Sequence, residues 1–253
     1  MSDASNRQVD RLLADTPMGI IGFGAFGQLI AEHLRACFPV LAYDIAPDRT
    51  RAEALGVRLV ALEAVAACPV VILAVPVGEM RGVAARLAPL LTPGALVLDV
   101  GSVKVEPAAI MLDTLPDHVE IVATHPLFGP VSARAGLRGA RIAICPLRGR
   151  RFRVAAFCRR LGLDVIMTTP EQHDRDAAEV QGLTHLVASL LTRMDLHPTR
   201  ITTRSFELMM SAVDMVRNDA PEVRHAILAS NPYAGDVLRR FKSLTSKLDD
   251  RGL

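Results

Sequence analysis

The chain has 253 residues, a formal net charge of +2, and 50% hydrophobic residues. This composition excludes a largely disordered chain, and the near balance of basic and acidic residues does not favour a nucleic-acid-binding surface. No apolar stretch reaches the length of a membrane span, and the polar lead of residues 1–17 lacks the apolar core of a signal peptide. We therefore expect a cytoplasmic protein without membrane or nucleic-acid partners, large enough for one substantial domain and a smaller second one.

Short apolar runs alternate with helical patterns from residue 18 to residue 170. The runs are Met18–Ile21, Val40–Tyr43, Val70–Val75, Ala95–Val100, Glu120–Ala123, Arg141–Cys145 and Asp164–Thr168. Such alternation is typical of βαβ units. It predicts an α/β class, with a Rossmann-type, mostly parallel sheet over residues 18–170.

The alternation stops at Pro170, and residues 171–253 carry only helical patterns. Helices are predicted over Thr199–Arg217, Pro221–Ala229 and Tyr233–Leu248, because prolines interrupt the pattern between them. So short a helical domain cannot bury all of its own apolar side chains. This favours a homodimer formed through the helical domain, and the alternative is packing against the chain's own first domain.

The four cysteines show neither a Cys-x-x-Cys pair nor the spacing of metal ligands. We expect them to be buried thiols without disulfides, and we expect no metal site. They are Cys37, Cys68, Cys145 and Cys158.

A glycine-rich motif follows the first predicted strand and precedes a helical pattern at Gln28–Arg35. It consists of Gly22, Phe23, Gly24, Ala25, Phe26 and Gly27. In this context the glycines permit a tight turn, close approach of the backbone to a pyrophosphate, and close contact between helix and strand. The alternative is a glycine turn that binds nothing.

Asp44 ends the second predicted strand, where a carboxylate can accept hydrogen bonds from the adenosine ribose of a dinucleotide. This favours NAD as the cofactor. Arg49 and Arg51 lie just downstream and could accommodate a 2′-phosphate, so NADP is the alternative cofactor.

Ligands of open α/β sheets bind outside the carboxyl ends of the strands. Val75 and Pro76 come at one such end and would form a wall beside the cofactor. Ser102 and Lys104 follow the next strand, and His125 follows the one after. A histidine there can accept the proton of a substrate hydroxyl while hydride leaves for a nicotinamide, although a lone histidine is often structural.

Four segments carry a resemblance to a known family. They are GFGAFG at 22–27, DVGSVK at 99–104, HPLFGP at 125–130 and HDRDAAEVQGLTH at 173–185. In this order they resemble the prephenate and arogenate dehydrogenase family of tyrosine biosynthesis, and the tail is more similar to its short, single-function arogenate dehydrogenases. The resemblance implies NAD(P)-dependent oxidative decarboxylation of the small molecules arogenate or prephenate.

The resemblance also implies roles for single residues. His125 would take the proton of the substrate 4-hydroxyl, and Ser102 would hydrogen-bond both the histidine and that hydroxyl. Lys104 would support the turn or a ligand charge. In the helical domain, Gln181 and His185 lie four apart, on one face of a helix, and match family positions that contact substrate.

One departure from the family concerns the substrate. Prephenate-using members share an arginine where this chain has Asp214 or Met215, and Arg217 is the nearest replacement. Asp219 matches a position that is acidic in arogenate-selective members, where it would attract the substrate ammonium. The alternative is that Asp219 caps the helix that begins at Pro221.

His173 and Asp174 lie at a predicted helix start, which favours a capping or domain-junction role. Two other functions remain open. An imine or 3-hydroxyacid dehydrogenase would share the Rossmann half, but several of these use a lysine in the following long helix, and Glu171–Arg193 contains none. A non-catalytic dinucleotide-sensing module would keep the fold, but the presence of both Ser102 and His125 argues against it.

Overall fold

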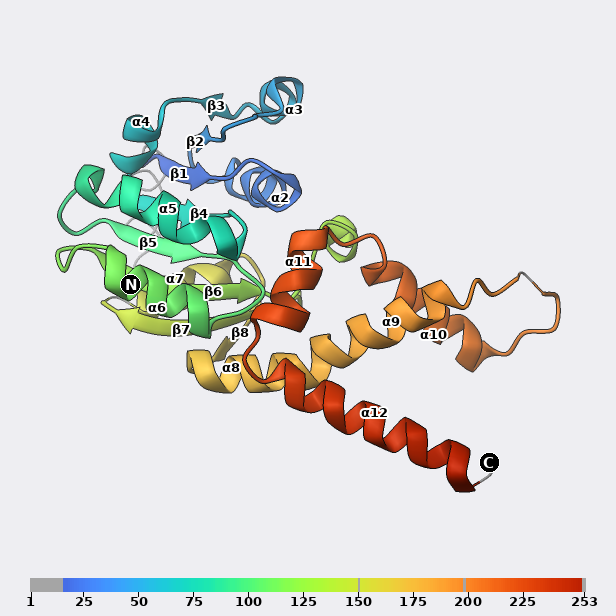
Figure 1. Cartoon of the computed structure of the whole chain (residues 1–253). Helices are drawn as coiled ribbons and strands as arrows, with labels where there is room; N and C mark the ends of the chain where they lie inside the picture. The colour runs from blue at the N-terminus through green and yellow to red at the C-terminus, as the bar shows by residue number, and fades with distance from the viewer. Residues whose placement is uncertain (1–15, 150, 198, 252–253) are drawn as a thin grey trace. The chain divides into compact units, whose positions relative to one another are not determined.

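The computed structural model describes residues 16–149, 151–197 and 199–251 (Figure 1). They form two compact units. The first, here called the sheet unit, runs to Gly101 and continues over Pro107–Thr169, and the second, the helical unit, contains Ser102–Glu106 and the residues from Pro170 onward. Apart from its last two residues, the predicted polar lead lies outside the described residues.

An eight-stranded sheet in the order β3-β2-β1-β4-β5-β6-β7-β8 forms the sheet unit. Its strands are β1 Met18–Ile21, β2 Val40–Tyr43, β3 Arg58–Leu59, β4 Val70–Leu73, β5 Leu96–Asp99, β6 Glu120–Pro126, β7 Arg141–Arg148 and β8 Asp164–Met167. The described pairs are parallel except for β6 with β7. The predicted Rossmann-type, mostly parallel sheet is confirmed.

The sheet is covered by apolar side chains on both faces. Ile72 and Leu73 are consecutive residues of β4, so their side chains point to opposite faces, and each belongs to a different buried cluster. The helices that contribute to these clusters and to a third one are α2 Ala25–Leu34, α3 Arg49–Leu55, α4 Leu62–Ala66, α5 Val77–Leu87, α6 Val105–Thr114 and α7 Arg151–Arg160. Burial on both faces explains why central strands such as β1 and β4 read as continuous apolar runs.

The predicted strand ends at Ala123 and Cys145 are wrong. β7 folds back beside β6 and pairs with it antiparallel, with His125 opposite Ala143. This pairing extends β6 to Pro126 and β7 to Arg148. In place of a crossover helix, the described connection contains a short 3₁₀ turn, η2 Ser132–Ala135, and antiparallel neighbours need no longer link than this.

The described part of the second unit is helical. Its elements are α8 Pro170–Ala177, the π-helical turn η3 Ala178–Gly182, α9 Leu183–Arg193, α10 Arg204–Val216, α11 Pro221–His225, the π-helical turn η4 Ala226–Ser230, and α12 Ala234–Arg251. The predicted helix start at Thr199 is wrong, because the Thr203 side chain caps α10 by accepting the N–H of Phe206 at 3.3 Å. Neither π-helical turn was predicted.

Three of the four cysteine thiols are buried, as predicted, but Cys37 is exposed. Burial raises the pKa of the Cys158 thiol to about 11. Within the described ranges, no helix combines the length and the apolar character that a bilayer span requires.

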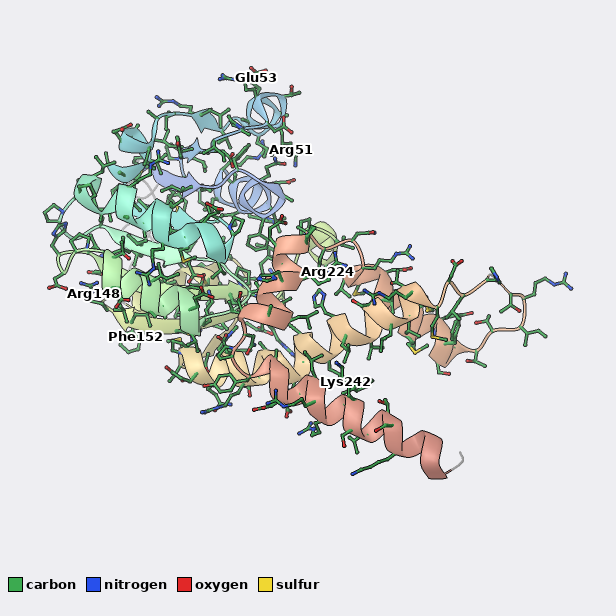
Figure 2. All side chains as sticks on the ribbon, viewed as in Figure 1. Arg51, Glu53, Arg148, Phe152, Arg224 and Lys242 are labelled. Atoms are coloured by element: carbon green, nitrogen blue, oxygen red, sulfur yellow. The ribbon has the colours of Figure 1, made fainter. Side chains whose placement is uncertain are left out.

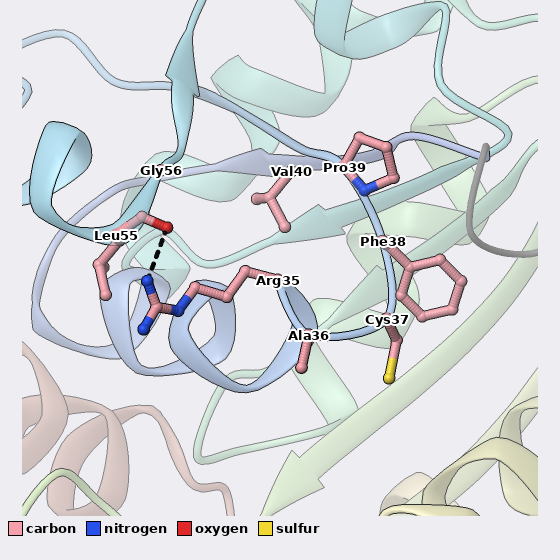
Figure 3. Close-up of a pocket in the computed structure, with 8 residues that line it drawn as sticks. All are labelled: Arg35, Ala36, Cys37, Phe38, Pro39, Val40, Leu55 and Gly56. Atoms are coloured by element: carbon pink, nitrogen blue, oxygen red, sulfur yellow. Dashed lines mark hydrogen bonds between the residues drawn. The ribbon is translucent and has the colours of Figure 1, made fainter.

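Cys37 lines a surface hollow together with Phe38, Val40 and Leu55, and Arg35 closes one side by donating to the Leu55 carbonyl at 3.2 Å (Figure 3). Val40 is the first residue of β2, so the hollow lies at the amino end of that strand. Ligands of parallel sheets bind at the opposite, carboxyl ends. This hollow is therefore not the candidate site.

Candidate active site

The three glycines of the loop between β1 and α2 differ in what a side chain would meet at each position. Gly22 has φ +96°, and a Cβ there would lie 2.3 Å from the Ala74 carbonyl oxygen. A Cβ at Gly27 would lie 2.0 Å from the Gly22 carbonyl oxygen. A Cβ at Gly24 would meet no atom within 4 Å. Turn geometry and packing thus require Gly22 and Gly27, whereas a side chain at Gly24 would point into open space.

That open space lies at the N-terminus of α2. The helix begins at Ala25, three residues before the predicted start at Gln28, and no side chain caps it. The first backbone N–H groups of a helix have no partner within the helix, and the helix dipole favours an anion beside them. The loop residues Ala25, Phe26 and Gly27 belong to this first turn, so the site suits a pyrophosphate.

Asp44 lies against the glycine loop. One carboxylate oxygen accepts the Phe23 N–H at 2.6 Å, and the other accepts the Ala46 N–H at 2.8 Å. An ionised carboxylate has about four acceptor positions, so Asp44 retains capacity for ribose hydroxyls. The Phe23 ring is buried in the core, so only its backbone is available to a ligand.

Two neighbours complete this end of the sheet. Val75 lies beside the glycine turn, because its Cγ1 would be 3.0 Å from a Cβ at Gly22, and Pro76 precedes α5 as its N-cap. Arg51, labelled in Figure 2, forms an ion pair with Glu32 at 2.9 Å. The sequence alone did not show that the Arg51 charge is engaged by an acid of α2.

Asp99 fixes the carboxyl ends of β5 and β6. Its side chain is fully buried and accepts the N–H groups of Gly101 at 2.9 Å and Thr124 at 3.3 Å. The Thr124 hydroxyl donates to the Asp99 carbonyl at 2.5 Å. His125 is the next residue, inside β6 and only 4% exposed. Sequence reasoning assigned Asp99 no role, although an acid at the end of an apolar strand was a usable signal.

Aromatic contact links the glycine loop to the segment after His125. The rings of Phe26 and Phe128 lie 6.5 Å apart between centroids, tilted by 38°. Both side chains are half-buried. The structure therefore brings the first turn of α2 and the HPLFGP segment together within the sheet unit.

In the helical unit, Asp174 binds the segment that carries Ser102. Its fully buried carboxylate accepts the N–H of Lys104 at 2.7 Å and that of Val105 at 2.9 Å. The predicted helix start at Asp174 is wrong, because α8 begins four residues earlier, at Pro170, and the backbone N–H groups that Asp174 accepts are those at the start of α6. The Lys104 side chain is fully buried.

A second polar cluster in the helical unit contains His185, Asp219 and Arg224. The His185 Nε2 atom lies 3.5 Å from a carboxylate oxygen of Asp219. The alternative role of Asp219 as a helix cap is wrong, because Ala220 is the N-cap of α11 and no side chain caps that helix. Arg224 lies in α11 and is labelled in Figure 2.

Burial dominates the electrostatics of this cluster. It lowers the pKa of His185 below 6.5, and there the Asp219 charge opposes the change while the Arg224 charge adds to it. Burial also raises the pKa of Asp219 above 3.8, against the charges of His185 and Arg224. His185 is therefore neutral at pH 7, and Arg224 is the nearby cation that sequence reasoning missed.

Two other predicted substrate-binding residues, Gln181 and Arg217, have different surroundings. The Gln181 side-chain oxygen is buried and has no hydrogen-bond partner among the described residues. Gln181 lies in η3, so the regular helical spacing assumed between it and His185 is interrupted. Arg217 pairs with Asp214 at 3.2 Å, both side chains being exposed, and the contacts of the cluster do not include it.

We expect the free energy of unfolding to fall as pH decreases below 6.5 toward the lowered folded-state pKa of His185. Over this range the unfolded chain takes up a proton on His185 and the folded chain does not, so acid favours unfolding. Denaturant titrations above and below pH 6.5 measure the effect. His185→Gln should flatten this slope, and the exposed-site control His225→Gln should not. An unchanged slope in His185→Gln would contradict the expectation.

Comparisons with known proteins point in one direction. A sequence family described as "Prephenate dehydrogenase, nucleotide-binding domain" matches residues 30–150. Arogenate dehydrogenase 1 of Arabidopsis thaliana is 30% identical over 237 residues, which cover 88% of this chain and 37% of the relative. A probable arogenate/prephenate dehydrogenase of Methanocaldococcus jannaschii is 29% identical over 80% of this chain and 48% of the relative. The chain thus spans less than half the length of these two relatives.

The fold has solved counterparts as well. The structure of prephenate dehydrogenase from A. aeolicus, in complex with hydroxyphenyl propionate and NAD+, superposes with a TM-score of 0.74 at 23% identity. The match covers 94% of this chain and 91% of that one. It shows that both units, taken in chain order, follow an architecture already seen in crystals.

Proposed function

Because the chain belongs to the prephenate and arogenate dehydrogenase family, we propose that it catalyses the oxidative decarboxylation of a cyclohexadienol with a nicotinamide dinucleotide. The observation that carries the proposal is an arrangement in the sheet unit. The N-terminus of α2 has no side-chain cap and follows the open position at Gly24. Its first turn contacts the segment that follows the buried His125. The first feature suits a pyrophosphate, and the second supplies a group for proton transfer.

In the proposed reaction, His125 accepts the proton of the substrate 4-hydroxyl as the carbon that bears it loses a hydride. When bound, the dinucleotide supplies the acceptor for that hydride. The bond between the ring and its carboxylate then breaks and carbon dioxide leaves. The electron pair of that bond stays with the ring, which becomes aromatic. Ser102 would hydrogen-bond the hydroxyl and hold it in line with His125.

The residues proposed to hold the dinucleotide are the glycine loop and Asp44. We propose NAD rather than NADP, because Asp44 would repel a 2′-phosphate and the Arg51 charge is already paired with Glu32.

Replacement of Asp44 by serine should shift the preference toward NADP, since it removes both the ribose acceptor and the repelling charge. The ratio of kcat/KM for the two dinucleotides measures this shift. Asp48→Asn is the matched control, because it removes a nearby charge and keeps a good cap for α3. An unsubstituted protein that prefers NADP would show that the cationic side chains dominate the pocket.

The cluster in the helical unit supports arogenate as the favoured substrate. Asp219 is an acceptor suited to an ammonium group, and the Gln181 oxygen, which has no hydrogen-bond partner among the described residues, is a second acceptor elsewhere in the helical unit. Arg224 offers the positive charge that a side-chain carboxylate needs, in place of the family arginine that this chain lacks at Asp214 or Met215. Arogenate carries both groups on one carbon, whereas prephenate has a keto group in place of the ammonium.

We also propose a cytoplasmic homodimer formed through the helical unit, without nucleic-acid or membrane partners. Many large apolar side chains of that unit are exposed in the single chain, including Val180, Leu190, Met194, Leu208, Met209 and Met215. Exposed apolar area on this scale is typical of an interface. The mass in solution, measured by light scattering after gel filtration, tests the dimer.

The proposed activity is tested by incubating the purified chain with arogenate or prephenate and either dinucleotide. Formation of reduced nicotinamide together with tyrosine or 4-hydroxyphenylpyruvate is the expected result. Dinucleotide binding without turnover of either compound would contradict the proposal and favour a sensing module. Turnover of a 3-hydroxyacid or an imine instead would favour the other reductase class.

A further inference from the structure

We propose that Asp174 is a positioning residue, which holds the turn containing Ser102 in the geometry that the reaction needs. This inference rests on the proposed function, in which the Ser102 hydroxyl orients the substrate. Asp174 itself would not touch the reacting atoms. Its carboxylate would act through the backbone two and three residues beyond the serine.

The hydrogen bonds of Asp174 are directed at this turn. One carboxylate oxygen accepts the Lys104 N–H at 2.7 Å, and the other accepts the Val105 N–H at 2.9 Å. Val105 begins α6, so these donors belong to a helix N-terminus that lacks partners of its own. The residues joined in this way are 70 and 69 positions apart in the sequence. A usual helix cap comes from the residue that directly precedes the helix, whereas here the acceptor comes from another helix.

Asp174 is in turn fixed from other directions. The His173 Nδ1 atom lies 2.8 Å from the same oxygen that accepts the Lys104 N–H. The buried Asn231 side chain donates to the Asp174 backbone carbonyl at 2.8 Å and accepts the Tyr233 N–H at 2.9 Å. A residue that positions another must itself be held by its surroundings. Asp174 meets this condition through both its side chain and its backbone.

The turn is thus held on each side by a buried aspartate. Before Ser102, the Gly101 N–H is bound by Asp99 within the sheet unit. After Ser102, the N–H groups of Lys104 and Val105 are bound by Asp174 within the helical unit. Ser102 is half-buried in a bend between these two anchors. Loss of either anchor frees the backbone that sets the direction of its hydroxyl.

A double-mutant cycle on the full chain tests the inference. Asp174→Asn keeps the size of the side chain but directs an amide N–H at one of the two backbone donors. We expect it to lower kcat by about 10–100-fold, the scale of a misplacement near 1 Å, with little change in KM for NAD. Ser102→Ala should also lower kcat. The double variant should then be no slower than Ser102→Ala alone, because Asp174 has nothing left to position.

The matched control is Asp176→Asn, an exposed aspartate on the same helix whose partner is Gln172. It should leave kcat unchanged. If Asp174→Asn does not fold, Asn231→Ala enters the same cycle, since it removes the donor to the Asp174 backbone and keeps the carboxylate. Thermal unfolding of each variant reports the fraction folded.

The outcomes separate the inference from the proposed function. Losses that multiply in the double variant would show that Asp174 acts on the fold in general, and they would overturn the inference while the function stands. A normal kcat in Ser102→Ala or in Asp174→Asn would do the same. An unsubstituted chain that oxidises neither compound would overturn the function, and the inference with it.

Discussion

His125→Asn should abolish turnover while leaving dinucleotide binding intact. Asparagine keeps a polar side chain of similar size but cannot accept a proton at neutral pH, and loss of a general base lowers kcat by about 10²–10⁴-fold. Stopped-flow or steady-state measurement of reduced nicotinamide gives the rate. Fluorescence titration gives the dissociation constant of NAD, which should stay within about twofold because the glycine loop is unchanged.

The control for this variant is His118→Asn. His118 is exposed and lies in the turn before β6, at the opposite end of the strand from His125. Its replacement should leave kcat as it was. A His125→Asn protein that retains near-normal kcat would remove the histidine from the mechanism. Because His125 is buried, the thermal unfolding of the variant is measured as well, so that a loss of folded protein is not mistaken for a loss of the general base.

Asp219→Asn should change substrate preference. The substitution removes an attraction for the ammonium of arogenate and a repulsion of the prephenate side chain. A partly desolvated pairing of this kind is worth about 1–3 kcal/mol, which corresponds to about 5–150-fold in the ratio of kcat/KM for the two substrates. Competition between arogenate and prephenate in one reaction measures this ratio directly.

Asp214→Asn is the comparison for this second experiment. Its carboxylate is exposed and pairs with Arg217, so its loss should leave the ratio nearly unchanged. Parallel falls in both kcat/KM values for Asp219→Asn would contradict a role in discrimination. They would instead indicate that the contact with His185 serves only the packing of the helical unit.

The sequence predicted the central strands well because strands such as β1 and β4 are buried on both faces. Continuous apolar runs marked β1, β2 and β4 within two residues of their ends. The two-residue strand β3 has no such run. The antiparallel return of β7 could not be predicted either, since the direction of a strand depends on its connection rather than on its own residues.

Part of the candidate site could also be predicted from the sequence, because some of its residues follow a local pattern. Gly22, Gly24 and Asp44 follow a local spacing that the backbone imposes, so they could be found without a structure. The position of Arg224 beside His185 and the hydrogen bonds of Asp174 bring together segments that are far apart in the chain. No local sequence pattern predicts them. The π-helical turns were not predicted either, because the helical period was taken to run unbroken through both segments.

The antiparallel pairing of β6 with β7 has a consequence for the order of folding. The parallel neighbours in this sheet are joined through crossover connections, whereas β6 and β7 are joined by the segment 127–140. In a parallel pair every pair of partners has the same separation along the chain, whereas in this antiparallel pair the separation is smallest at Pro126 with Ile142 and grows toward Ile121 with Arg148. Partners that are nearer in sequence cost less chain entropy to bring together, so we expect this pairing to form first beside its connection and then to extend. His125, opposite Ala143, would belong to the part of this pairing that becomes ordered first.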